Sequence, residues 1–245
     1  MSSYEALAGA YDALTYDIPY EKMLAFWEEI LCRAGVTPAS VLDLACGTGS
    51  LTRLLCQKGM DVTAADLSQD MLTEAMDKLS DLDENRPQFI CQSMQELTLP
   101  YGVDWVVSCL DSINYLTDPQ DCRETFKRVY ACLNHGGMFT FDVNSREKLS
   151  SLDGEVWLDE TEDTYCVWRT EFEDNICYYG VDLFTREGDT WRRDWEEHEQ
   201  YAYSQEQLTE FLTEAGFQNI RFYGDFTFDA PKKGTQRIFV SAIKE

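Results

Sequence analysis

The feature that most constrains the fold is an apolar run, VLDLACGTGS at 41–50, that passes directly into a turn of small residues and then into a helical pattern. Gly47 and Gly49 in this turn allow the backbone to approach a ligand closely. A strand, a glycine turn and a helix in this order are typical of the first unit of a parallel α/β sheet. The segment therefore predicts both a fold class and a place where backbone N–H groups meet a ligand.

Further apolar runs follow, and each is separated from the next by residues at helical spacing, such as Met71, Leu72 and Ala75. This alternation predicts an α/β fold, a Rossmann-like seven-stranded mostly parallel sheet with helices on both faces. A chain of 245 residues has room for such a sheet and one elaboration. The first five strands are predicted at 40–45, 60–66, 87–92, 103–109 and 137–143, after a helix at about 20–34.

The composition and the hydrophobic pattern of the sequence change after Asn144. Residues 153–203 are rich in Trp, Tyr, Thr and Glu, and they alternate in polarity at 164–172 and 176–185, which predicts antiparallel strands. The α/β pattern then resumes with a helix at 204–215 and strands near 217–224 and 235–243.

We therefore predict three parts of the chain. A helical leader or lid comes first, and an antiparallel β insertion after the fifth strand covers the cleft and interrupts the core. The boundaries are 1–36 for the leader, 37–146 and 204–245 for the core, and 147–203 for the insertion.

Two acids stand near the ends of the first two predicted strands, Asp43 and Asp66. An acid in the second position can accept hydrogen bonds from both hydroxyls of an adenosine ribose, although Asp66 is also a possible N-cap of the next helix. Asp43 ends an apolar strand, so a ligand or backbone N–H groups must satisfy it. A dinucleotide fingerprint requires glycine where Thr52 stands, and no lysine follows to make a phosphate-binding loop.

With these acids, 41–50 resembles the first motif of the class I S-adenosylmethionine-dependent methyltransferases, with Ala45 where many members have glycine. AADLSQDML at 64–72 resembles the second motif, CQSMQEL at 91–97 the adenine-edge loop, and VDWVVSCLDSINYL at 103–116 the fourth strand and its loop. The leader, DSINYL and the late β insertion are similar to the bacterial YqeM-like small methyltransferases.

The resemblance implies S-adenosyl-L-methionine as the cofactor and S-adenosyl-L-homocysteine as the product. Ser93 stands where many members have aspartate, so the adenine amino contact passes to the Ser93 hydroxyl or the Met94 backbone. Tyr11, in the leader, and Cys109, after the fourth strand, are expected to line the same site. The implied contacts are the methionine end at Asp43, Ala45, Gly47 and Gly49, the ribose at Asp66, and the adenine at Leu67, Met71, Ser93 and Met94.

Open α/β sheets bind ligands beyond the carboxyl ends of their strands, so the segment after the fourth strand is expected to face the substrate. Asp111 is a candidate to orient or deprotonate an amine acceptor, and Asn114 and Tyr115 are candidate substrate contacts. Asn114 is alternatively a turn cap, and Tyr115 a core residue. His198 is a candidate acid or base, chiefly for an oxygen acceptor, or a strand histidine without a catalytic role.

A sulfonium methyl group is already activated, so positioning of the acceptor is the main requirement and a dedicated base is not obligatory. The leader is compatible with a lid over the cofactor or with a plain packing helix, and its aromatic and acidic residues are Tyr4, Tyr11, Asp12, Tyr16 and Tyr20.

The net charge of the chain restricts the kinds of partner that it can bind. A formal net charge of −25, from 45 acidic and 20 basic residues, repels phosphate backbones and anionic lipid surfaces. We therefore expect a small-molecule methyl acceptor, nitrogen or oxygen, with no nucleic acid or membrane partner, in a monomer or homodimer. The alternatives are an RNA or protein methyltransferase and a non-catalytic S-adenosylmethionine-binding regulatory module.

Nine cysteines occur without any C-x-x-C pair, and His135 and His198 are the two histidines. This pattern predicts reduced core thiols and no metal site. The start of the chain lacks a basic segment followed by an apolar one, so we expect a cytoplasmic protein.

Overall fold

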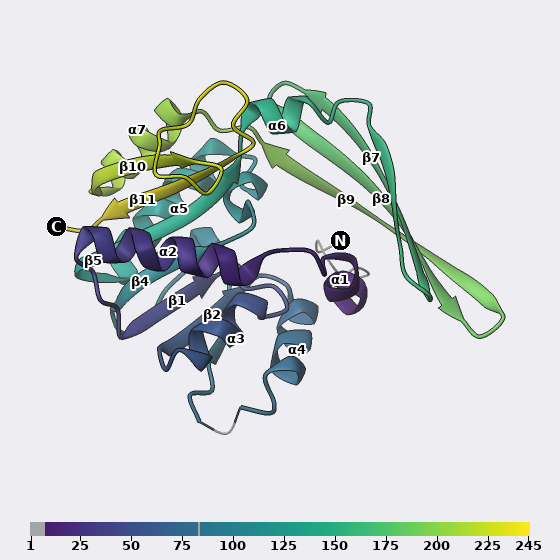
Figure 1. The fold of residues 1–245 in the computed structure, drawn as a ribbon, viewed down its shortest axis with the longest axis horizontal. Coiled ribbons are helices and arrows are strands. Elements are labelled where there is room, and N and C mark those ends of the chain that lie inside the picture. The colour runs from purple at the N-terminus through teal and green to yellow at the C-terminus, as the bar shows by residue number, and fades with distance from the viewer. Residues whose placement is uncertain (1–7, 83) are drawn as a thin grey trace.

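The computed structural model describes residues 8–82 and 84–245, so Tyr4 of the leader lies outside the described residues. Two sheets form the molecule (Figure 1): a seven-stranded sheet in the order β10-β11-β5-β4-β1-β2-β3 and a four-stranded sheet in the order β6-β7-β8-β9. The predicted fold class is confirmed. The strands of the larger sheet are β1 (Ser40–Leu44), β2 (Asp61–Asp66), β3 (Gln88–Cys91), β4 (Val103–Ser108), β5 (Leu133–Asn144), β10 (Gln218–Gly224) and β11 (Arg237–Ile243).

The first five strands of the larger sheet run parallel, and β11 inserts antiparallel between β5 and β10. The last strand of the chain therefore lies inside the sheet, next to the edge strand β10. Because β1 and β4 are buried nearly throughout, they carry continuous apolar runs instead of alternation.

Helices cover both faces of this sheet. Their bounds are α1 (Ala8–Leu14), α2 (Tyr20–Ala34), α3 (Ser50–Gln57), α4 (Gln69–Lys78), α5 (Pro119–Cys132), α6 (Arg146–Ser150) and α7 (Gln205–Ala215), with short 3-10 helices η1 (Met94–Glu96) and η2 (Ser112–Tyr115). No helix in the described ranges has both the length and the apolarity that crossing a bilayer requires.

Local sequence explains where these helices begin and end. Ser204 and Gln207 form a capping box at the start of α7, and Gly216 ends it in the left-handed conformation with φ 105°. The Asp118 side chain accepts from the backbone N–H of Gln120 and caps α5, whose first residue is proline.

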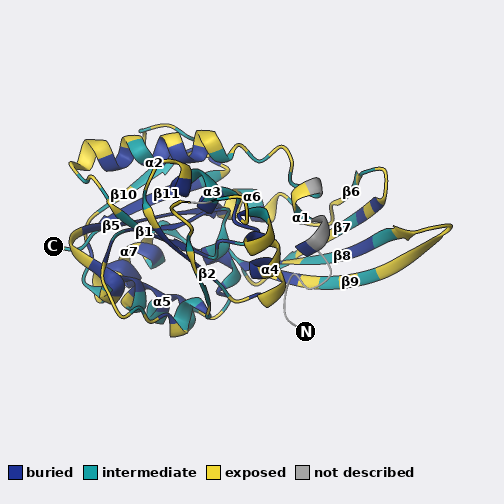
Figure 2. Cartoon of the chain, turned by 90° about the horizontal axis from the view of Figure 1, so that it is seen from below, coloured by how far each residue is buried: buried dark blue, intermediate teal, exposed yellow. Residues whose placement is uncertain are grey.

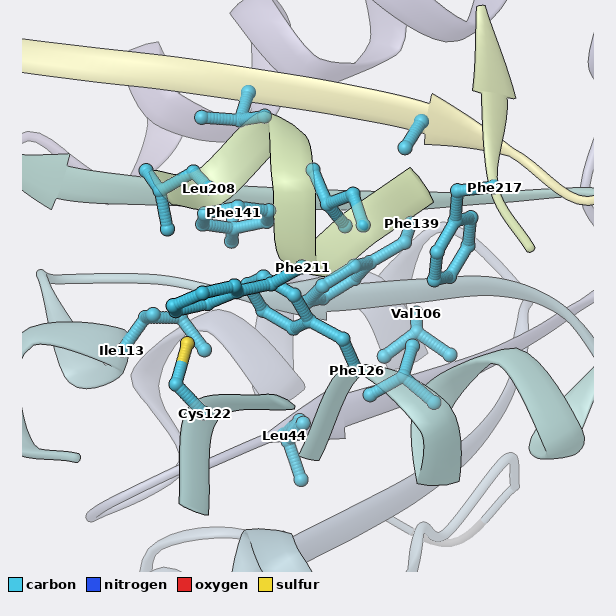
Figure 3. Close-up of a cluster of buried hydrophobic side chains, with 14 of the residues drawn as sticks. Leu44, Val106, Ile113, Cys122, Phe126, Phe139, Phe141, Leu208, Phe211 and Phe217 are labelled. Carbon is cyan, nitrogen blue, oxygen red and sulfur yellow. The ribbon is translucent and has the colours of Figure 1, made fainter. Parts of the chain in front are cut away.

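The core consists of two apolar layers, one on each face of the sheet. Side chains of α2 and α3 pack against one face, with Trp27 and Trp105 fully buried. The other face packs against α5 and α7 through an aromatic cluster that includes Phe126, Phe139 and Phe141 (Figure 3). These two layers hold the carboxyl ends of the parallel strands in place.

The insertion leaves the core after β5 through α6 and returns before α7. Its strands are β6 (Val156–Glu160), β7 (Thr164–Glu173), β8 (Ile176–Glu187) and β9 (Thr190–Tyr201), and β9 forms an edge of the sheet. β8 and β9 extend well beyond the core (Figure 1), and their far end is exposed (Figure 2).

The two faces of this four-stranded sheet differ. Cys166, Val181 and Leu183 are buried on one face, where Leu14 of α1 packs against them. The pairing register assigns the exposed apolar residues to the opposite face, which we call the outer face. They are Val156, Leu158, Tyr165, Tyr178, Trp191 and Trp195.

Candidate functional site

A cavity of about 1050 Å³ lies where the carboxyl ends of the parallel strands face β9. Segments far apart in the sequence contribute to its lining, and they come from both sheets and from α1. Lining residues are found at 11, 20, 43–48, 51, 66–68, 71, 92–95, 109–110, 112, 115–118, 121 and 192–199.

The glycine turn after β1 has three residues in the left-handed conformation: Ala45 at φ 61°, Gly47 at 54° and Gly49 at 77°. A Cβ atom on Gly47 would have no neighbour within 4 Å, so the turn opens on space. A Cβ atom on Gly49 would lie 3.0 Å from Leu79 Cδ1, so this glycine allows the turn to pack closely. Gly49 shapes the turn without lining the cavity, whereas Ala45 and Gly47 line it.

Asp43 is 1% exposed, and its Oδ2 accepts a 2.6 Å hydrogen bond from Thr52 Oγ1. Burial raises the pKa of this carboxyl to about 7, the Thr52 bond opposes the rise, and the charge of Asp66 adds to it. A positively charged ligand group beside it would restore the ionised form.

Asp66 ends β2 and accepts two backbone hydrogen bonds, from Gly47 N–H at 2.8 Å and from Ser68 N–H at 2.9 Å. Its pKa is raised chiefly by burial, and these bonds limit the rise. The N-cap of α4 is Ser68, whose Oγ accepts from Met71 N–H at 3.2 Å. The alternative interpretation of Asp66 as the helix N-cap is therefore wrong.

The predicted adenine-edge residues lie together at the cavity. Leu67 is 64% exposed, Met71 is buried, and Met94 lines the wall beside Ser93. The Ser93 hydroxyl donates to Glu96 Oε2 at 2.9 Å, so its proton is already used within the protein.

Helix α1 is attached to the glycine turn and to α4. Asp12 accepts a 2.6 Å hydrogen bond from Thr48 Oγ1 and forms an ion pair with Lys78. Tyr11 lines the cavity, and burial raises its pKa well above the usual value. Tyr20 also lines the cavity, whereas Tyr16 is 85% exposed.

The segment after β4 is strained and firmly held. Leu110 and Asp111 adopt φ 58° and 51°, which non-glycine residues rarely do. Their N–H groups donate to the two oxygens of Asp142, at 2.9 and 3.1 Å. Asp142 is fully buried in β5 and is paired with Arg237 of β11. Burial raises the pKa of Asp142, and the Arg237 guanidinium opposes this rise.

Asp111 lies beside the main cavity, on a smaller adjoining pocket of about 210 Å³ that Tyr11 and Tyr115 also line. Its Oδ1 is 2.9 Å from Arg237, and its Oδ2 accepts from Gln200 Nε2 at 2.5 Å. Both oxygens of the candidate catalytic acid are therefore engaged in holding the loop to the two sheets.

Asn114 does not reach the cavity. It is fully buried, its Nδ2 donates to the carbonyls of Tyr201 and Asn144, and its Oδ1 accepts from Asn144 N–H. The expected substrate contact at Asn114 is therefore wrong, since these backbone partners saturate the amide, and the residue instead joins η2 to β5 and β9.

Cys109 lines the cavity but is 7% exposed, and its Sγ accepts from Trp27 Nε1 at 3.3 Å. Burial raises the pKa of this thiol well above its usual value, so it packs as a neutral group.

His198 and Glu196 lie side by side on β9, with 3.0 Å between His198 Nε2 and Glu196 Oε2 and side-chain exposures of 2% and 9%. Tyr115 meets the His198 ring edge to face, with centroids 6.2 Å apart. All three residues line the cavity. Sequence reasoning missed Glu196, although the alternation along β9 places residues 196 and 198 on one face.

Comparisons with known proteins agree with this geometry. A family model described as a methyltransferase domain matches residues 41–137. YqeM of Bacillus subtilis (strain 168), a protein that carries the name of a methyltransferase, is 35% identical over 98% of this chain and 97% of its own length. A glycine/sarcosine N-methyltransferase of Parasynechococcus marenigrum (strain WH8102) is 26% identical over 78% of this chain and 67% of its own length.

Among solved structures, an S-adenosylmethionine-dependent methyltransferase from Clostridium acetobutylicum ATCC 824 superposes with a TM-score of 0.87 at 33% identity, covering 99% of both chains. The sugar N-methyltransferase KedS8 from Streptoalloteichus shares the fold, with a TM-score of 0.78 at 19% identity over 98% of this chain and 93% of its own. The chain belongs to the S-adenosylmethionine-dependent methyltransferases.

Proposed function

We propose that this enzyme transfers the methyl group of S-adenosylmethionine to a nitrogen or oxygen atom of a small molecule bound in the 1050 Å³ cavity. The observation that carries the proposal is the construction of this cavity. One wall is made of the glycine turn and the segments after β2 and β3, and the facing wall is made of η2, the start of α5 and β9. A cofactor against the first wall leaves the second for an acceptor.

The residues of the first wall fit the cofactor. Gly47 leaves open space in which the protein backbone can approach a ligand closely. The buried Asp43 carboxyl suits the ammonium group of the methionine end. Asp66 suits the ribose hydroxyls, and Leu67 and Met71 suit the two faces of adenine. When bound, the cofactor supplies a methyl group already activated on a sulfonium sulfur.

The enzyme's contribution is then mainly positional. The acceptor atom must approach the methyl carbon from the side opposite sulfur while water is excluded, and such alignment can supply about 7–11 kcal/mol of the barrier. We propose that α1, attached through Asp12 to Thr48 and Lys78, acts as a lid that excludes water.

A small acceptor is favoured because residues of α1 and β9 line the cavity together with the core, so the acceptor must fit between them. The glycine/sarcosine N-methyltransferase among the relatives is named for small amine substrates. The nine free thiols support the prediction of a reducing, cytoplasmic location.

The direct test is methyl transfer by the purified chain. Calorimetry should show binding of S-adenosylhomocysteine and none of NAD, and tritiated methyl groups should pass from S-adenosylmethionine into a small-molecule fraction. Label in RNA or protein, with none in small molecules, would contradict the proposed acceptor class.

A further inference from the structure

We infer that the acceptor is a small amine, cationic in solution and without phosphate groups, whose nitrogen is received by Glu196 and His198. This inference rests on the proposed function and narrows its acceptor class. It starts from the wall that faces the cofactor residues, which we call the acceptor wall and define as the cavity-lining residues at 115–118, 121 and 192–199.

The acceptor wall is strongly acidic. The pairing register places Arg193, Glu197 and Glu199 on the outer face. The remaining lining residues of this wall carry four carboxylates, Asp118, Asp121, Asp194 and Glu196, and one guanidinium group, Arg192.

Carboxylates already pair with both arginines of this segment. Arg192 lies 2.7 Å from Asp194 and 3.2 Å from Glu187. Arg193 donates to the buried Asp182 at 2.9 Å. An anionic acceptor would therefore have to displace an internal ion pair and would face the remaining negative charge, whereas a cation is attracted.

Charge alone does not locate the acceptor, but the Glu196–His198 pair does. Both side chains are at least nine-tenths buried and line the cavity, and their facing atoms are 3.0 Å apart. A protonated amine beside this pair would have the Glu196 carboxylate as its counter-charge, away from bulk water, where attraction between opposite charges is strong. The adjacent imidazole can take the proton that the amine must lose before it reacts.

The groups around this pair are compatible with an amine. The Tyr115 ring packs edge to face against His198, and Tyr11 lines the same cavity from α1. Asp111 and Arg237 line the adjoining pocket, and Gln200 donates a hydrogen bond to Asp111. Aromatic rings bind ammonium groups through their faces, so Tyr11 and Tyr115 add to the preference for a cation.

The proton and electron balance is complete without a further reactant. The bound ammonium group gives one proton to the imidazole of His198, and Glu196 stabilises the imidazolium. The nitrogen lone pair then forms the N–C bond as the C–S bond breaks. S-adenosylhomocysteine leaves, the methylated amine leaves as a cation, and His198 returns its proton to solvent.

The experiment uses the full chain, tritiated S-adenosylmethionine and a bacterial small-molecule extract. The labelled products are first resolved from unreacted S-adenosylmethionine, which is itself a cation, and are then separated by ion exchange at neutral pH beside a reaction without enzyme. Label retained on the cation exchanger is expected. Label in the neutral or anionic fractions would overturn this inference and leave the proposed function intact. Binding of S-adenosylhomocysteine with no label in any fraction would overturn both.

Two variants test the residues, with the labelled cationic fraction as the acceptor. Glu196→Gln should raise KM for the acceptor at least tenfold, and His198→Asn should lower kcat about 10²-fold or more. Both should bind S-adenosylhomocysteine within twofold of the parent. Glu171→Gln makes the same change as the first variant on the exposed outer face and should alter neither constant. Unchanged KM in Glu196→Gln, with cofactor binding intact, would remove Glu196 from the acceptor site.

Discussion

The two sheets differ in burial and in the pattern of apolar residues along their strands. In the seven-stranded sheet, β1 and β4 are buried on both faces beneath helices, and apolar residues run along them with little alternation. In the four-stranded sheet, one face packs toward the core, while the outer face exposes side chains such as Trp195, at 53%, and Leu158, at 51%. The first sheet carries the glycine turn and the segments after β2 and β3, which we call the cofactor wall because we propose that it binds the cofactor. The second sheet contributes β9 to the acceptor wall, so stability and cofactor binding should depend mainly on the first.

The largest expected difference concerns stability. Phe141 is fully buried between Phe126 and Phe139, so Phe141→Ala should lower the free energy of unfolding by about 3–5 kcal/mol. Tyr165→Ala, on the outer face where Tyr165 is 40% exposed, should lower it by less than about 1 kcal/mol. Urea unfolding of both variants measures this. Equal losses would show that the two sheets contribute alike to stability.

A second effect distinguishes the cofactor wall by its pH dependence. Asp43 has an ordinary pKa near 3.8 that is raised to about 7 in the folded protein, so folding favours its protonated form. The stabilisation of the folded protein that comes from this protonation is complete below pH 3.8 and is lost as the pH rises through 7. Between pH 5 and pH 8 the unliganded protein should therefore lose roughly 2–3 kcal/mol through this group.

Asp43→Asn keeps an acceptor oxygen for Thr52 and should remove that part of the pH dependence. Urea midpoints at several pH values compare the variant with the parent. Parallel pH profiles for the two proteins would show that Asp43 titrates normally.

A third experiment separates cofactor binding from stability within the cofactor wall. Charge-assisted hydrogen bonds contribute about 1.5–3 kcal/mol each, so Asp66→Ala should weaken binding of S-adenosylhomocysteine at least tenfold. Ser68→Ala removes the true N-cap of α4 and should cost about 1 kcal/mol of stability with affinity nearly unchanged. Calorimetry and thermal melts on both variants are needed. A lowered melting temperature with full affinity in Asp66→Ala would exclude Asp66 from the ribose site.

The smallest effect tests the strain in the glycine turn. Ala45 adopts φ 61°, a conformation that costs an L-residue roughly 1–2 kcal/mol. Glycine avoids this cost, but part of the gain in stability is lost because glycine also makes the unfolded chain more flexible. Ala45→Gly should therefore raise the free energy of unfolding by up to about 1 kcal/mol. The same change in a strand, Ala64→Gly in β2, should lower it by at least about 0.5 kcal/mol. If both variants lose stability, the turn is not strained at Ala45.

Local patterns were sufficient for the fold of the core. The apolar runs, the glycine turn and the Ser204 cap lie within a few residues of the elements they determine, so sequence alone placed the seven strands. The same patterns marked Asp43 and Asp66 at the ends of β1 and β2. No local pattern marks α6 or β6, because α6 is a single short turn and β6 a five-residue edge strand.

The misassigned and missed residues depend on partners that are distant in sequence. Asn114 looked like a cleft residue because it follows β4, but the carbonyls of Asn144 and Tyr201 saturate it. Asp142 and Arg237 were not singled out because their pairing requires β11 to lie beside β5. Glu196 became visible only when β9 was seen to form part of the cavity.

The bond between Asp142 and Arg237 has a consequence for the order in which the enzyme assembles. As the chain is synthesised, the glycine turn and the acids Asp43 of β1 and Asp66 of β2 emerge early and can form their contacts locally. The loop after β4 is held by Asp142, whose own charge is compensated only when β11 inserts between β5 and β10. Contacts between residues so far apart form slowly, so we expect maturation of the acceptor side to be the late step of folding. A nascent chain that ends before Arg237 should have the cofactor wall without a competent acceptor side.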